Sequence, residues 1–136
     1  MSDHLFVYGT LRAGLNHPLL RLLARHGSPV GPARFGGRLY DLGAYPGVVP
    51  DRGAGWRVAG DLWLLHAPAL VLPELDRYEG CHPAQPPPHE YRRERHPVRV
   101  ADGTTREAWI YLYNGAVDPG RLIRSGDYFN RTPETP

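Results

Sequence analysis

The sequence predicts an α+β fold: a small mixed sheet, largely antiparallel and barrel-like, with about two or three short helices attached. The 136 residues leave room for one hydrophobic core, and the 16 glycines and 15 prolines divide the chain into short elements. Several short segments have strand patterns, and two of them flank a hairpin turn. We expect a single domain over residues 1–129 and a flexible tail over residues 130–136.

The first predicted strand lies close to the N-terminus. Residues 5–7, Leu-Phe-Val, form a continuous apolar run, which is typical of a strand buried on both faces. Gly36-Gly37 marks a bulge or a bend within the next strand, and Pro97 favours an edge strand or a bulge. Asp102-Gly103 is a strong hairpin signal. The further predicted strands cover residues 35–42, 48–49, 56–65, 91–100 and 106–113.

One helix is predicted between the first two strands. It begins at residues 16–17, so that Pro18 falls in the first turn, where a missing backbone N–H costs least. Leucines over residues 19–23 form its apolar face, and Gly27 ends it. A connector over residues 29–32 then leads to the next strand.

A second helical segment covers residues 68–78. We expect Pro73 to divide it into two short helices, because proline cannot donate the backbone hydrogen bond of a helix interior. Gly80 ends the second of these. Residues 81–89, which include Pro86-Pro87-Pro88, are predicted to form an extended surface loop. A stiff connector is favoured for this loop, and a ligand for a proline-binding module is the alternative.

Composition excludes several classes of function. All 16 basic residues are arginine, and the net charge of +2 argues against a nucleic-acid partner. No segment reaches the roughly 18 apolar residues of a membrane helix, and no signal-peptide core is present. We therefore expect a cytoplasmic protein with no membrane partner. Without a short histidine ligand pair or a nucleotide-binding motif, we expect neither a metal nor a cofactor.

Two stretches are candidates for a functional site. The first is Tyr8-Gly9-Thr10-Leu11, where a glycine turn follows the first strand and precedes a helix. Backbone N–H groups in such a turn can point at an anion. An ordinary connection between a strand and a turn explains the pattern equally well.

The second candidate is Glu79, which directly precedes the glycine at the end of the second helical segment. The C-terminal end of a helix carries partial negative charge, so we expect the pKa of this carboxyl group to be raised. A solvated glutamate at a helix end is the alternative. Cys81, the single cysteine, has no evident base near it, and an incidental thiol is favoured over a nucleophile.

A series of motifs adds a family resemblance that spans most of the chain. In order, they are Phe6-Val7-Tyr8-Gly9-Thr10-Leu11-Arg12, Asn16-His17, Leu39-Tyr40-Asp41-Leu42-Gly43 with Tyr45-Pro46-Gly47, Val58-Ala59-Gly60-Asp61-Leu62-Trp63, Leu75-Asp76 to Glu79-Gly80-Cys81, Tyr91 with Arg93, Ala108-Trp109-Ile110-Tyr111, and Ile123 with Ser125-Gly126-Asp127-Tyr128. The chain resembles the γ-glutamylcyclotransferase-like family, in particular its γ-glutamylamine cyclotransferase, or AIG2-like, branch. The family commonly has tryptophan where this chain has Tyr128, and the proline loop is unusually long, so the leaving group stays open.

The resemblance implies a fold that contains a small β-barrel, and an enzyme acting on a small γ-glutamyl substrate. It implies that Tyr8, Gly9, Thr10 and Leu11 hold the γ-glutamyl group and that Glu79 is the catalytic acid and base. In this reaction the α-amine of the γ-glutamyl group attacks its own γ-carbonyl, and 5-oxoproline and a free amine are released. Because the nucleophile belongs to the substrate, no serine, cysteine or metal is required.

Three alternatives stay open. A non-catalytic γ-glutamyl-binding module would keep the glycine turn without needing Glu79. A protein-interaction module would use the proline loop, and an amide hydrolase would release free glutamate. Tyr91 and Arg12 are left out of the predicted site, because a buried strand tyrosine and a solvated arginine are equally expected there.

Overall fold

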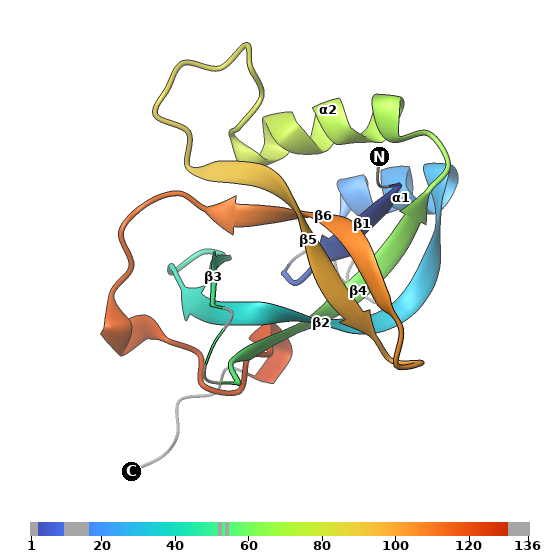
Figure 1. The fold of residues 1–136 in the computed structure, drawn as a ribbon. Helices are drawn as coiled ribbons and strands as arrows, with labels where there is room; N and C mark the ends of the chain where they lie inside the picture. Colours follow the sequence, from blue (N-terminus) through green and yellow to red (C-terminus); the bar gives the residue numbers. More distant parts are fainter. Residues whose placement is uncertain (1–2, 10–16, 52, 54, 131–136) are drawn as a thin grey trace.

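The computed structural model describes residues 3–9, 17–51, 53 and 55–130 of the chain (Figure 1). Within these residues the chain forms six strands, two α-helices and two short 3-10 helices. The strands are β1 (His4–Val7), β2 (Gly27–Asp41), β3 (Pro46–Pro50), β4 (Arg57–Leu65), β5 (Tyr91–Val100) and β6 (Thr105–Tyr113).

The strands form one curved sheet with the order β3-β2-β4-β1-β6-β5. The far end of β5 pairs with β2 at Ala33 and Arg34, so that five strands close into a barrel and β3 extends one end of β2. All pairings are antiparallel except the one between β1 and β6. The predicted mixed, largely antiparallel barrel with short helices is confirmed.

Strand β2 is longer than predicted. It begins at Gly27, directly after the first helix, so the expected connector over residues 29–32 is wrong. A register shift between Pro29 and Gly31 lets the strand pass its prolines while it stays paired with β4. Beyond Gly36 the same strand pairs with β3 instead of β4. The predicted irregularity at Gly36-Gly37 is therefore a change of partner.

The two α-helices pack over one side of the barrel (Figure 1). Helix α1 (Pro18–His26) begins as predicted, and the Nδ1 atom of His17 caps it by accepting from the backbone N–H of Leu19. Helix α2 (Pro68–Glu79) is continuous, so the predicted division at Pro73 is wrong. Buried apolar side chains on both sides of Pro73 hold the helix together in spite of the missing hydrogen bond.

The end of α2 sets the position of the predicted site. Gly80 takes a left-handed conformation with φ of 76° and ends the helix as expected. Residues 81–90 then form a loop that leads to β5, one residue longer than the predicted loop over residues 81–89. The predicted tail lies outside the described residues except for Asn130, which belongs to the 3-10 helix Tyr128–Asn130. None of the described helices is long and apolar enough to cross a bilayer.

The core has two parts, which explains the apolar run in β1. Phe6 points into the barrel, where it packs with Phe35 and the other inward side chains. Leu5 and Val7 point the other way and pack beneath the helices, together with Leu23. Strand β1 is therefore buried on both faces, as its sequence predicted.

The close approach of β4 to β1 gives a first prediction. A side chain at Gly60 would place its Cβ atom 2.6 Å from Cζ of Phe6, closer than packed carbon atoms come. We expect Gly60→Ala to lower the free energy of unfolding by about 2 kcal/mol in urea denaturation. The control is Gly36→Ala in β2, where the nearest atom would lie 3.4 Å away, an ordinary contact. Equal stability of the two variants would contradict the close packing at Gly60.

Candidate active site

A cavity of about 250 Å³ lies between the end of β1, the start of β3, the C-terminal end of α2 and the β5–β6 hairpin. Its lining residues include Tyr8, Gly9, Tyr45, Glu79, Glu90 and Tyr111. The cavity thus brings together the two stretches that the sequence singled out, which are about 70 residues apart in the chain. Thr10 and Leu11, the other predicted site residues, lie outside the described part of the chain.

Glu79 is the last residue of α2 and is partly buried. Within the described part of the chain its carboxylate makes no hydrogen bond and no ion pair. Burial, followed by the negative charges of Glu90 and Asp76, raises the pKa of Glu79 to about 7. The sequence predicted the direction of this pKa shift from the helix end, but the largest cause in the structure is removal of the carboxyl group from water.

The turn after β1 forms a second wall of the cavity. A Cβ atom at Gly9 would lie only 2.9 Å from Cγ of Pro46, so a side chain here would collide with the start of β3. Glycine therefore leaves the backbone open toward the cavity. The ring of Tyr8 is buried, and its hydroxyl donates to the backbone oxygen of Tyr111 at 2.5 Å. Tyr8 accordingly contributes a rigid wall.

Two further tyrosines are fixed in the same way. The hydroxyl of Tyr91 donates to the backbone oxygen of Pro46 at 2.5 Å, and the hydroxyl of Tyr111 donates to Oδ1 of Asp76 at 2.7 Å. Burial raises the pKa of both hydroxyl groups, and negative neighbours add to the rise. Both therefore stay protonated at neutral pH and shape the cavity.

Glu90 and Tyr45 form the outer rim. The Tyr45 hydroxyl donates to Glu90, and this hydrogen bond is the main reason that the pKa of Tyr45 is raised to about 12. With Glu79 inside and Glu90 at the rim, the described lining contains two carboxylates and no cationic side chain. The cavity thus presents negative charge, which favours a ligand with an amino group.

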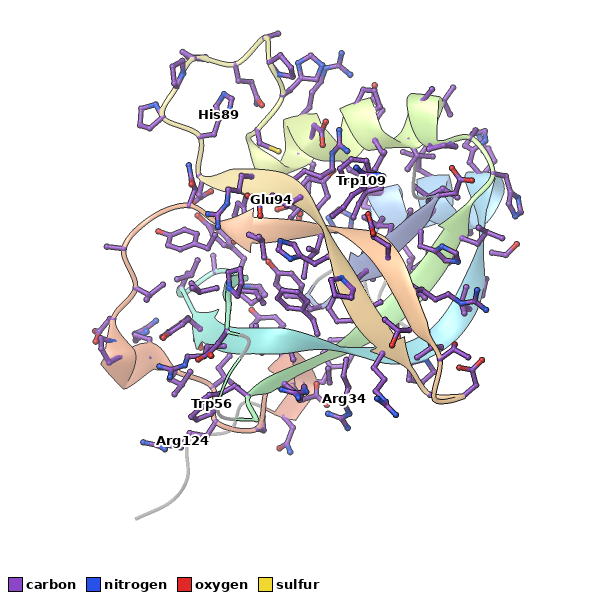
Figure 2. The ribbon with its side chains drawn as sticks, in the orientation of Figure 1. Arg34, Trp56, His89, Glu94, Trp109 and Arg124 are labelled. Carbon is purple, nitrogen blue, oxygen red and sulfur yellow. The ribbon has the colours of Figure 1, made fainter. Side chains whose placement is uncertain are left out.

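Behind Glu79, one turn earlier on α2, Asp76 is anchored from two strands. Its carboxylate accepts from Nε of Arg93 at 2.8 Å and from Nη2 of Arg93 at 3.1 Å, in addition to the Tyr111 hydroxyl. The guanidinium group of Arg93 also lies 4.3 Å from the ring centre of Trp109, which Figure 2 labels just below helix α2. This network ties the last turn of α2 to β5 and β6, and so fixes the position of Glu79.

The other reactive groups do not take part in the cavity. The Sγ atom of Cys81 lies 4.0 Å from Oδ1 of Asp76, and burial together with that negative charge raises the pKa of the thiol to about 11. A protonated thiol is a poor nucleophile, in agreement with the favoured incidental role. In the described part of the chain no cluster of His, Cys, Asp or Glu side chains is arranged to hold a metal ion.

Sequence reasoning left out part of the lining. Tyr45 and Tyr111 lie within the motifs that carry the family resemblance, so the motifs contained the signal for them. Tyr91, left out of the predicted site, lines the cavity, whereas Arg12 lies outside the described residues. Glu90 follows the proline loop, in no motif, and only the fold brings it to the cavity.

The fold and the cavity define a small barrel protein whose aromatic pocket holds one carboxyl group without a hydrogen bond or ion pair among the described residues. Comparison with known protein families specifies the family: the family model described as "Gamma-glutamyl cyclotransferase, AIG2-like" matches residues 5–130. The chain belongs to this γ-glutamyl cyclotransferase family.

Relatives and solved structures agree with this assignment. A Vibrio cholerae protein named as a candidate gamma-glutamylcyclotransferase is 36% identical over 132 residues, which are 96% of this chain and 99% of the relative. The gamma-glutamylcyclotransferase family protein YtfP of Escherichia coli is 33% identical over 94 residues, 69% of each chain. An AIG2-like protein from Mus musculus has the same fold, with a TM-score of 0.71 at 24% identity, covering 96% of this chain and 90% of that one.

The anchor at Asp76 gives the second prediction. Asp76→Asn leaves the largely buried Arg93 guanidinium without its carboxylate, and we expect the free energy of unfolding to fall by about 3 kcal/mol. Glu74→Gln is the control, because Glu74 on the same helix pairs with Arg77 in an exposed position, where such pairs contribute about 0.5 kcal/mol. Chemical denaturation of both variants tests this, and similar losses would contradict an anchoring role.

The raised pKa of Glu79 predicts how stability depends on pH. The pKa of this carboxyl group rises from 4.5 to about 7 on folding, so the folded state resists its ionisation. The contribution of Glu79 to the free energy of unfolding is therefore fully present below pH 4.5 and is lost as the pH rises through 7. Glu79→Gln removes this loss. We expect the variant to match the wild type near pH 4 and to be more stable by up to about 3 kcal/mol above pH 8.

Thermal or chemical denaturation at both pH values measures the difference between the two proteins. Because each comparison is made at one pH, the other titrating groups cancel to first order. A gain of the same size at pH 4 and pH 8 would contradict the raised pKa.

Proposed function

We propose that the protein cyclises a γ-glutamyl amine or γ-glutamyl peptide, releasing 5-oxoproline and a free amine, with Glu79 as general acid and base. The observation that carries the proposal is the Glu79 carboxyl group, which lines the cavity, makes no hydrogen bond or ion pair within the described residues, and has its pKa raised to about 7. A group with that pKa both accepts and returns a proton at neutral pH.

The reaction needs two proton transfers. The α-amino group of the substrate must lose a proton before it attacks the γ-carbonyl carbon, and the departing amine must gain one as the C–N bond breaks. Glu79 takes the first proton and delivers the second, so the protein is unchanged at the end. The negative lining formed by Glu79 and Glu90 supports binding of the substrate in its ammonium form before that first transfer.

The remaining contribution is conformational. Ring closure within one molecule gains from a folded substrate, because the reacting atoms are already held together. The fixed rings of Tyr8, Tyr91 and Tyr111 supply a rigid wall for this. Gly9, with Thr10 and Leu11, would offer backbone N–H groups to the substrate carboxylate or to the oxyanion that develops on the γ-carbonyl oxygen.

Family membership supports the γ-glutamyl group as the part of the substrate that is recognised. For the leaving group, we propose the amine of a γ-glutamyl amine, as in the γ-glutamylamine cyclotransferase branch of the family. Tyr128 is buried and is not among the described residues that line the cavity, so it does not enter the proposal for the leaving group.

The leading alternative is a γ-glutamyl-binding module without catalysis, and the partner-binding alternative would use the proline loop. The raised pKa of Glu79 favours the enzyme, because a binding role alone does not need a proton-transfer group poised near pH 7. An amide hydrolase is distinguished by its product, since it would release free glutamate.

The test is to incubate the purified protein with γ-glutamyl amines, γ-glutamyl dipeptides and glutathione and to measure 5-oxoproline. We expect Glu79→Gln to bind substrate but to lose at least about 100-fold in turnover, and the pH profile of the wild type to show a limb near pH 7 that the variant lacks. Glu74→Gln, an exposed change on the same helix, is the control.

Release of 5-oxoproline by Glu79→Gln at a rate close to that of the wild type would contradict the role of Glu79 as general acid and base. Binding without product across the whole panel would instead favour the non-catalytic module. Free glutamate in place of 5-oxoproline would identify a hydrolase.

A further inference from the structure

A second hollow lies on the outer face of the barrel. It has a volume of about 340 Å³ and is lined by Arg34, Gly55, Trp56, Arg57, Arg124 and Ser125. Among the described residues it shares no lining residue with the cavity that contains Glu79. Figure 2 shows Arg34, Trp56 and Arg124 together at the lower edge of the molecule, on the opposite side of the barrel from helix α2.

The three arginines of this hollow come from separate parts of the chain. Arg34 lies in β2 and Arg57 begins β4. In the register of these strands Arg34 is opposite Ala59, two residues from Arg57, so both side chains project from the same outer face of the barrel.

Arg124 reaches the hollow from the segment after β6, and that segment is fixed on both sides. The backbone N–H of Ile123 donates to the oxygen of Leu39 at 2.7 Å, and the N–H of Ala59 donates to the oxygen of Gly126 at 2.7 Å. The convergence of the three charges is therefore built into the fold and does not depend on a free chain end.

These arginines also lack acidic partners. None of Arg34, Arg57 and Arg124 forms an ion pair with a carboxylate within the described part of the chain, and the only partner recorded for Arg57 is the backbone oxygen of Trp56, at 2.9 Å. By contrast, the nearby Arg38 pairs with Asp51 at 2.7 Å.

A fourth positive charge adds to the imbalance. Arg99 lies directly opposite Arg34 where β5 pairs with β2. Like charges opposite each other on neighbouring strands are destabilising, so this face gains from binding a negative group.

We propose that this hollow, which we call the arginine hollow, binds a small molecule through a phosphate group. A guanidinium group offers paired N–H donors that match phosphate oxygens, and three of them can hold one group of high negative charge. The aromatic ring of Trp56, which has the Arg38 guanidinium 5.4 Å from its centre, closes one wall. The volume lies within the range of small-molecule sites.

The experiment titrates the purified protein with pyrophosphate and, separately, with ADP at low ionic strength, and measures binding by calorimetry. We expect both to bind, and the double variant Arg34→Gln/Arg124→Gln to bind each at least about tenfold more weakly. The control is Arg21→Gln/Arg25→Gln, which removes the same charge from exposed positions on α1. We expect the control to bind within about twofold of the wild type.

The two probes separate the sources of the phosphate. Equal affinity for pyrophosphate and ADP indicates that the phosphate group alone is recognised. Tighter binding of ADP, reduced to the level of pyrophosphate by Trp56→Ala, indicates a nucleotide. Both results support the arginine hollow.

Other results overturn the proposal. An equal loss of affinity in the double variant and in the control would show attraction by overall charge alone. If neither pyrophosphate nor ADP binds, the proposed phosphate site is contradicted. The same conclusion follows if an RNA oligonucleotide binds through these arginines while neither probe does. Melting temperatures of all variants are compared with the wild type, because a surface change of this kind leaves folding intact.

Discussion

The position of the candidate catalytic group depends on the contact between Asp76 and Arg93. Asp76 lies on α2 and Arg93 on β5, and their paired hydrogen bonds hold the last turn of the helix against the barrel. Among the described interactions, the hydrogen bond from the Tyr111 hydroxyl to the same aspartate is the other direct polar link between the C-terminal end of α2 and these strands. Glu79, three residues further on, takes its place in the cavity from this anchor.

The carboxyl groups of Asp76 and Glu79 differ in their electrostatic surroundings. Asp76 is buried but fully paired, so its charge is stabilised by Arg93 and Tyr111. Glu79 is removed from water with no such partner among the described residues, so the pKa of its carboxyl group is raised to about 7. Two carboxyl groups one helical turn apart therefore differ in role, because among the described residues only Asp76 is paired with an arginine.

Local signals in the sequence predicted the elements that depend on local chemistry. The caps at His17 and Gly80, the hairpin at Asp102-Gly103 and the doubly buried β1 all follow from residue type and spacing. The continuous α2 and the long β2 could not be predicted, because buried neighbours and a paired strand outweigh the local cost of Pro73 and Pro29. The site shows the same division: Glu79 stood out beside its glycine, whereas Glu90 reaches the cavity only through the path of the loop.

The charge distribution shows why composition alone describes this protein poorly. A net charge of +2 predicts weak electrostatic preferences. In the fold, however, Glu79 and Glu90 line one cavity, and three arginines that have no acidic partner in the described part of the chain line a hollow elsewhere on the barrel. Since the effect of a charge on a ligand falls off within about 8 Å in physiological salt, each site acts through its own charges and not through the average. Among the described residues the barrel therefore presents two surfaces of opposite charge, which the net charge of +2 does not reveal.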